Sequence, residues 1–228
     1  MVSRVPLVAA VAFAVLAVLA VVVVPPGPGV SGTGAEIAAH LAGHAGMLRL
    51  QALLTALALL ALAVVLGYAR DRIDGPAGHI FTVGATVLIV STAIRTWFGA
   101  GLALHARDLD PDTARALADI AAMWRPVLTV AAVMLAGPVV WAARHGRFPR
   151  WLAVVAAVFV VEQGVESLTI VGPVGSFIAP SGAMNVYLGG ALTLGFLLAL
   201  GLATAQSDAA PTAAADPVAL PDPQPQAH

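Results

Sequence analysis

The sequence contains no cysteine, and all 11 of its lysine-or-arginine positions are arginine. Without cysteine the chain has no disulfide, no thiolate metal site and no thiol nucleophile. Without lysine it lacks the side chain whose amine forms Schiff bases and can act as a general base. The formal net charge is only -1, so no strong overall field attracts nucleic acid or an anionic surface.

Charge of either sign is scarce. Only 10% of the 228 residues are charged and 60% are apolar, with a mean hydropathy of +0.93. A soluble domain has about 25% charged and about 45–50% apolar residues. A soluble core of this length has no room for so many apolar side chains. The composition therefore excludes an ordinary soluble enzyme, a disordered chain and a nucleic-acid-binding protein, and it predicts a multi-pass membrane protein.

Six apolar stretches are long enough to cross the ~30 Å hydrocarbon core, which needs ~20 helical residues. None alternates like a barrel strand, so the spans are predicted to be helices. The predicted fold is an all-α bundle of six transmembrane helices, followed by a disordered cytoplasmic tail at 206–228, which is rich in Ala, Pro, Asp and Gln. The spans are 5–24, 48–69, 80–104, 126–143, 151–171 and 183–205.

Short helices are expected on the outer face of the bundle. Residues 36–47 have few helix breakers, so they are predicted to extend the second span or to lie on the surface. Asp110-Pro111 is typical of a helix N-cap followed by proline at the first helical position. A short amphipathic helix at 111–123 would then lead into the fourth span. Its solvated face would carry Asp112, Arg115 and Asp119.

The positions of the arginines predict the orientation. The positive-inside rule places the arginine-rich side in the cytoplasm. We therefore expect a cytoplasmic-membrane protein with both termini inside. The first span could be a signal peptide, but its apolar run is longer than usual and ends without a clear cleavage site, which favours an uncleaved anchor. The arginines on the predicted inner side are Arg4, Arg70, Arg72, Arg144, Arg147 and Arg150.

Three charged residues lie deep within the predicted spans: Arg95, Glu162 and Glu166. A charge near a span centre costs about 2.5–3.5 kcal/mol on insertion scales, so it usually faces protein or water. Glu162 and Glu166 are four residues apart and share a helix face, which Gln163 widens. Arg95 and Glu166 both lie ~22 Å from the inner edge at 1.5 Å per residue, so a charge pair between them is predicted.

Polar residues gather in the outer half of the predicted bundle, whereas the inner half is almost entirely Ala, Val and Leu. This asymmetry predicts a polar site open to the outside or just beneath it. The leading hypothesis is binding or translocation of a small solute, an ion or a proton. The candidate residues are Arg95, Glu162, Glu166, Gln163, Gln51 and Ser91.

A second pattern suggests a metal. Glu36, His40 and His44 recur every four residues and would form one helical stripe. Imidazole and carboxylate ligands suit zinc, iron, copper or nickel. The pattern lacks the internal glutamate of HExxH, so a zinc protease is excluded. The competing interpretation is a pair of pH-sensitive histidines at the surface or along a pore, and no other cofactor is predicted.

Two further classes of function stay open. One is an intramembrane enzyme or metal protein in which Glu162 and Glu166 act as acid–base groups or ligands. The other is a structural or accessory subunit, in which Arg95 and one glutamate only join two helices. Such interhelical polar contacts contribute about 0.6 kcal/mol in membranes. No nucleotide-binding, hydrolase or calcium-loop motif is present. Lipid and a small solute or ion are the expected partners.

Overall fold

The computed structural model describes residues 4–180 and 182–207, and every regular element in these ranges is helical. Six helical segments among them are long and apolar enough to cross a membrane, which confirms the predicted all-helical fold and the predicted number of helices of spanning length. They are α1 (Val5–Val22), α3 (Ala45–Arg70), α4 (Gly75–Leu102), α5 (Pro111–Arg144), α6 (Arg150–Glu166) continued by η3 (Ser167–Val171), and η4 (Met184–Gly189) continued by α7 (Gly190–Ser207).

Some boundaries differ from the predicted ones. Residues 111–123 do not form a separate short helix but are the first part of α5, which has 34 residues. Pro126, where a span is predicted to begin, lies inside this helix. A proline removes one backbone hydrogen bond but does not necessarily end a helix. Asp110 does cap α5, accepting a hydrogen bond from the Thr113 N–H at 3.0 Å. α7 extends two residues into the predicted tail, and 208–228 lie outside the described residues.

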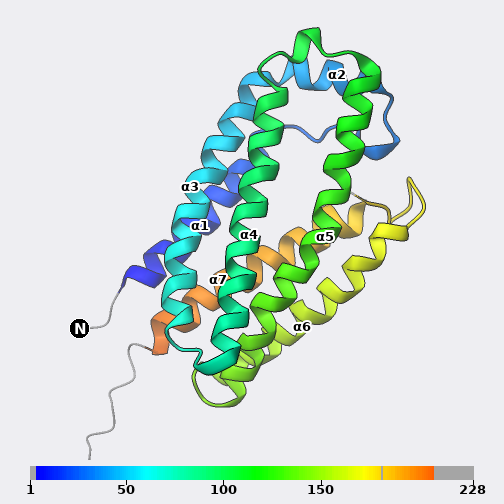
Figure 1. The fold of residues 1–228 in the computed structure, drawn as a ribbon. Helices are drawn as coiled ribbons and strands as arrows, with labels where there is room; N and C mark the ends of the chain where they lie inside the picture. Colours follow the sequence, from blue (N-terminus) through cyan, green and yellow to red (C-terminus); the bar gives the residue numbers. More distant parts are fainter. Residues whose placement is uncertain (1–3, 181, 208–228) are drawn as a thin grey trace, which may run out of the picture.

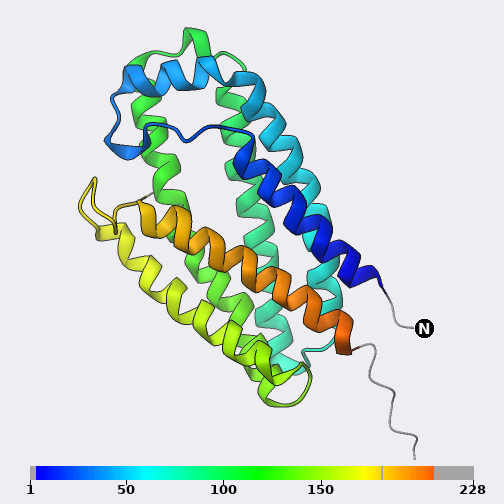
Figure 2. The same ribbon diagram turned by 180° about the vertical axis from the view of Figure 1, so that it is seen from behind.

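The six long segments form a ring. α1 packs on α3 and α7, and the chain then continues around the ring through α4, α5, α6 and back to α7. The short helix α2 (Gly34–Gly43) lies across one end of the ring, where it packs on α5 (Figure 1). The start of α1 and the end of α7 lie beside each other towards the opposite end (Figure 2). Most of the long helices therefore pack on their neighbours in the sequence, and α7 closes the ring by packing on α1.

The arginine-bearing turns meet at the end of the ring remote from α2. Arg147, in the turn between α5 and α6, makes an ion pair with Asp74, in the turn between α3 and α4, at 2.5 Å. Arg72 donates a hydrogen bond to the Thr204 carbonyl of α7 at 3.0 Å. Three segments that the sequence places on one side of a membrane are thus in direct contact.

The apolar core fills the half of the bundle that contains these turns. In α3 the buried residues begin only at Ala58, and in α4 they all lie between Gly78 and Ala85. The largest fully buried apolar side chains are Phe81, Phe196, Ile73, Leu135, Leu152 and Leu200. The other halves of α3 and α4, residues 45–57 and 86–102, contain no buried residue. The sequence asymmetry therefore corresponds to a difference in packing.

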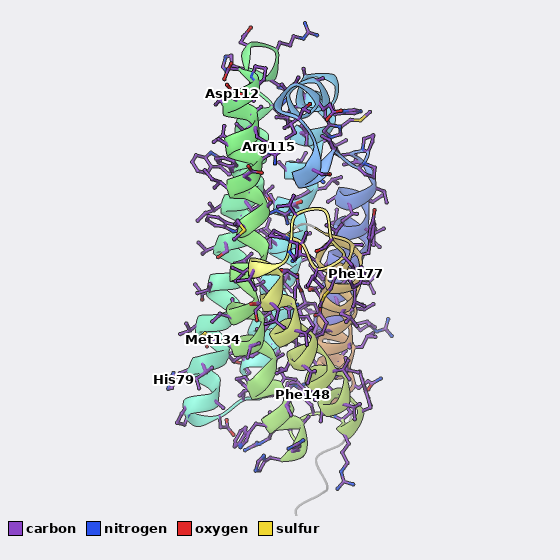
Figure 3. The ribbon with its side chains drawn as sticks, turned by 90° about the vertical axis from the view of Figure 1, so that its right-hand side faces the viewer. His79, Asp112, Arg115, Met134, Phe148 and Phe177 are labelled. Atoms are coloured by element: carbon purple, nitrogen blue, oxygen red, sulfur yellow. The ribbon has the colours of Figure 1, made fainter. Side chains whose placement is uncertain are left out.

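The helices also differ in how far they extend. α5 is about 50 Å long at 1.5 Å per residue, which exceeds the ~30 Å hydrocarbon core. Phe177, on the connection between α6 and η4, lies well short of Asp112 at the beginning of α5 (Figure 3). The first turns of α5 carry the Arg115–Asp119 ion pair at 3.1 Å on an exposed face. This part of α5 is therefore built for water, as its amphipathic sequence predicts.

Close contact between α4 and α5 depends on Gly84. A methyl group at this position would lie 2.7 Å from the Leu135 backbone nitrogen and 2.9 Å from the Ala131 carbonyl oxygen, so neither helix has room to yield. We expect Gly84→Ala to lower the unfolding free energy by about 1–3 kcal/mol through overpacking. The matched change Gly99→Ala, in the same helix, meets no atom within 4 Å. Chemical unfolding in detergent should show no loss for Gly99→Ala; equal losses in both variants would contradict this account of the packing.

Candidate functional site

The inward face of α6 changes from apolar to polar along its length. Leu152, Ala156 and Phe159 are buried in the core, and the next buried residues are Glu162, Gln163 and Glu166. Glu162 is 8% exposed and Glu166 is 1% exposed. The predicted polar stripe is therefore present on one face, and it points into the protein.

One amide joins the two carboxyl groups. Gln163 Nε2 donates to Glu162 Oε2 at 2.9 Å and to Glu166 Oε2 at 2.7 Å. Both hydrogens of this amide are thus directed at carboxyl oxygens. Asn185 Nδ2 donates to the other oxygen of Glu166, Oε1, at 2.5 Å. Asn185 belongs to η4, so Glu166 is held from two separate helical segments. We call Glu162, Gln163, Glu166 and Asn185 the acidic cluster.

The backbone of η4 is shaped around Glu166. η4 is a single stretch of π-helix, a wider turn that occurs rarely and often at functional sites. A methyl group on Gly189 would lie 2.5 Å from Glu166 Oε2 and 2.9 Å from its Cδ. The missing side chain at Gly189 therefore leaves the space that the carboxyl group occupies. The Met184 N–H bonds to the Phe177 carbonyl at 3.2 Å and joins the start of η4 to the preceding loop.

Several buried oxygen atoms at the cluster have no hydrogen-bond partner among the described residues. They are Glu162 Oε1, Asn185 Oδ1 and, one turn beyond Glu166, Thr169 Oγ1. Leaving a buried polar atom unsatisfied costs about 1–3 kcal/mol. Asn185 Oδ1 is an acceptor only, and so is Glu162 Oε1 while that carboxyl group is ionised, so each of them can accept a hydrogen bond or contact a cation. The cluster thus offers free acceptors in a closed environment.

The predicted site residues are only partly brought together. Gln51 lies on α3 and donates to the Ala20 carbonyl of α1 at 2.7 Å, so it joins two helices, neither of which carries a residue of the acidic cluster. The Ser91 carbonyl of α4 accepts a hydrogen bond from Trp124 Nε1 at 3.2 Å. Arg95 is exposed on α4, which packs on α3 and α5, whereas α6 packs on α5 and α7. The pairing of Arg95 with Glu166 stays a prediction.

Asn185 and Gly189 are members of the site that the predicted set of residues omits. An asparagine in an otherwise apolar span is a signal that sequence alone provides. Its partner, however, depends on how η4 faces α6. The glycine pair at 189–190 predicts close helix approach, and the structure shows that Gly189 makes room for a carboxyl group.

Glu36 has a structural role in the stripe proposed for a metal. Glu36 Oε2 accepts the Thr33 N–H at 2.7 Å and Thr33 Oγ1 accepts the Glu36 N–H at 3.3 Å, forming a capping box that begins α2. These bonds lower the pKa of Glu36. In the part of the chain that the structure describes, no three His, Asp or Glu side chains are grouped closely enough for a metal ion. The structure thus lends no support to this metal site.

The two histidines of that stripe stack on each other. The rings of His40 and His44 lie 4.5 Å apart, and His44 Nδ1 donates to the His40 carbonyl at 2.9 Å. Partial burial lowers the pKa of His40, and the neighbouring His44 lowers it further. The lowered pKa of His40 fits the interpretation of this stripe as a pH-sensitive surface feature.

Gly189→Ala should destabilise the contact between α6 and η4. Its methyl group would displace the Glu166 carboxyl group, which is buried and hydrogen-bonded on both oxygens. We expect a loss of about 1–2 kcal/mol in unfolding free energy from the broken hydrogen bonds. Gly195→Ala in α7 meets no atom within 4 Å and is the matched control. Unfolding curves that coincide for the two variants would show that Gly189 is not needed for this fit.

The lowered pKa of His40 predicts a pH dependence of α2. Because the folded protein binds fewer protons than the unfolded chain, stability is complete above the ordinary value of 6.5 and declines as the pH falls from there to the folded pKa. Hydrogen exchange of the α2 amides, corrected for intrinsic rates, should show protection that decreases in this window. His40→Gln should flatten the decrease. Protection that rises on acidification would contradict the assignment.

No family model matches the sequence, and neither a curated protein nor a solved structure matches it significantly.

Proposed function

We propose that the chain is a transport protein of the cytoplasmic membrane that binds a proton or a small cation at the acidic cluster as part of its translocation cycle. The observation that carries the proposal is the pair of buried carboxyl groups joined by one amide, with Glu162 Oε1 and Asn185 Oδ1 left without partners in the described residues. An ionisable group within a membrane span is a candidate functional residue by default.

A purely structural role does not explain Glu162. A polar residue that joins two helices needs a partner on another helix, and Glu166 has one in Asn185. The hydrogen bond of Glu162 comes from Gln163 of the same helix, and its second oxygen has no described partner. Glu162 therefore adds a buried carboxyl group without joining α6 to a neighbour. The energetic cost of burying this carboxyl group is explained if the group exchanges a proton or binds a cation.

The geometry favours a proton over larger ligands. Three of the four carboxyl oxygens already accept hydrogen bonds from amides, so few ligating atoms are left for a metal ion. A proton needs no cavity, and one proton on the pair removes a buried negative charge. Uptake at Glu162 Oε1 would convert an unpartnered acceptor into an O–H donor.

The location of the cluster suits access from the outside. Glu166 lies about 22 Å along α6 from Trp151 at 1.5 Å per residue, within the outer half of a ~30 Å core. Beyond it, η3 and the uncharged loop 172–180 connect α6 to η4. The contacts among the arginine-bearing turns support an orientation with both termini in the cytoplasm, because they place these turns at one end of the bundle.

Infrared difference spectroscopy of the protein in lipid nanodiscs tests proton binding directly. The carboxyl C=O band reports a protonated side chain, and it should disappear as the pH is raised. Glu162→Gln and Glu166→Gln should each remove part of the change because they keep the shape of the side chain but cannot titrate. Asp112→Asn, at the exposed start of α5, is the control and should leave the buried-carboxyl signal unchanged.

Two results would contradict the proposal. One is a spectrum of the unaltered protein in which no buried carboxyl group titrates at any pH at which the protein stays folded. The other is a signal that Glu162→Gln and Glu166→Gln reduce no more than Asp112→Asn does. If Glu166→Gln unfolds the protein, Glu162→Gln still decides the matter, because Glu162 makes no described contact with another helix.

A further inference from the structure

A second polar feature lies at the end of the bundle near α2, far along α3 from the core. It is a hollow of about 250 Å³ between the junction of α2 and α3 and the segment that follows α4. Two buried alanines, Ala103 and Ala106, contribute to its lining. Its polar lining comes from Arg49, His105, Arg107 and Asp108.

Two arginines from separate elements face this hollow. Arg49 belongs to α3 and Arg107 to η2 (Ala106–Asp108), and both are exposed. In the described ranges neither guanidinium group has a hydrogen bond or an ion pair. Other arginines do have such partners: Arg70 bonds to Thr82, Arg147 to Asp74. Two positive charges that line one small hollow repel each other unless an anion lies between them.

The beginning of α3 adds to the positive potential. Ala45, its first residue, lines the hollow, and the N-cap residue His44 makes no side-chain hydrogen bond to the first turn. The first N–H groups of a helix carry a partial positive charge and are good donors to anions. The start of α3, with its backbone N–H donors, and two guanidinium groups therefore line the same hollow.

We propose that this hollow binds a phosphate group. The planar fork of a guanidinium group matches two phosphate oxygens, and two arginines from different elements can hold a tetrahedral anion from two sides. Asp108 is the one acidic group in the lining. It opposes anion binding and lowers the affinity for phosphate. Removing the charge of Asp108 should therefore raise this affinity, whereas removing an arginine charge should lower it.

The level of the hollow relative to a bilayer determines where the phosphate comes from. The helical path from Arg49 to Arg70 is about 31 Å, which is about the thickness of the hydrocarbon core. With Arg70 at one interface, Arg49 lies at the headgroup level of the other. Leu104 lines the hollow and is 62% exposed, as suits a residue at this boundary. The phosphate is either a lipid phosphodiester or inorganic phosphate from the outer solution.

The test uses the full chain, purified in detergent without phosphate. One arm measures binding of inorganic phosphate by calorimetry. The other adds phosphatidylglycerol or phosphatidylcholine and counts retained lipid by native mass spectrometry. Arg49→Gln and Arg107→Gln should each weaken binding about tenfold or more, since each removes a charge-assisted hydrogen bond. Arg144→Gln, exposed at the end of α5, is the matched control and should change nothing.

The outcomes separate the two sources. Saturable binding of inorganic phosphate that both arginine variants lose identifies free phosphate; retained lipid that both variants lose identifies a headgroup. In either arm Asp108→Asn should tighten binding, because it removes a negative charge from the lining. The proposal is overturned if neither ligand binds, or if Arg144→Gln weakens binding as much as Arg49→Gln.

Discussion

The fit of the Glu166 carboxyl group into the space beside Gly189 is the constraint on which the packing of α6 against η4 depends. α6 and α7 pack through apolar side chains near Phe159 and Phe196, whose rings stack at 4.7 Å. Beyond those rings the contact between α6 and η4 includes polar atoms: a bridging glutamine, an asparagine and a carboxyl group. The π-helical turn and the glycine bring the backbone of η4 close enough for these bonds. The proposed proton site thus lies where its side chains also determine how two helices fit together.

The two halves of the bundle therefore differ in how densely their helices are packed. In one half, small residues let helices approach closely and bury Phe81, Leu135 and Leu200 in an apolar core. In the other half, residues 45–57 of α3 and 86–102 of α4 bury nothing in the described structure, and their apolar side chains are exposed in a manner suited to lipid.

Much of the fold could be predicted from the sequence, because long apolar runs need lipid and lipid permits few structures. The shared face of Glu162 and Glu166 follows from their spacing alone. What could not be predicted depends on neighbours. The pairing of Arg95 with Glu166 rests on equal depth alone and stays a prediction, because equal depth does not say which helices are neighbours; α4 and α6 each pack on α5. Pro126 suggested a boundary inside what is one helix, and neither the π-turn of η4 nor the convergence of Arg49 and Arg107 has a sequence signature.

Proton flux is the most direct test of the central claim that the acidic cluster moves protons. The protein would be reconstituted in vesicles with an imposed pH gradient, and the internal pH followed with a trapped dye. The account predicts that the gradient dissipates faster than in empty vesicles, and that Glu162→Gln with Glu166→Gln removes the difference while Asp112→Asn does not. Dissipation by the double variant at the rate of the unaltered protein, or no dissipation above empty vesicles under any gradient or added solute, would contradict it.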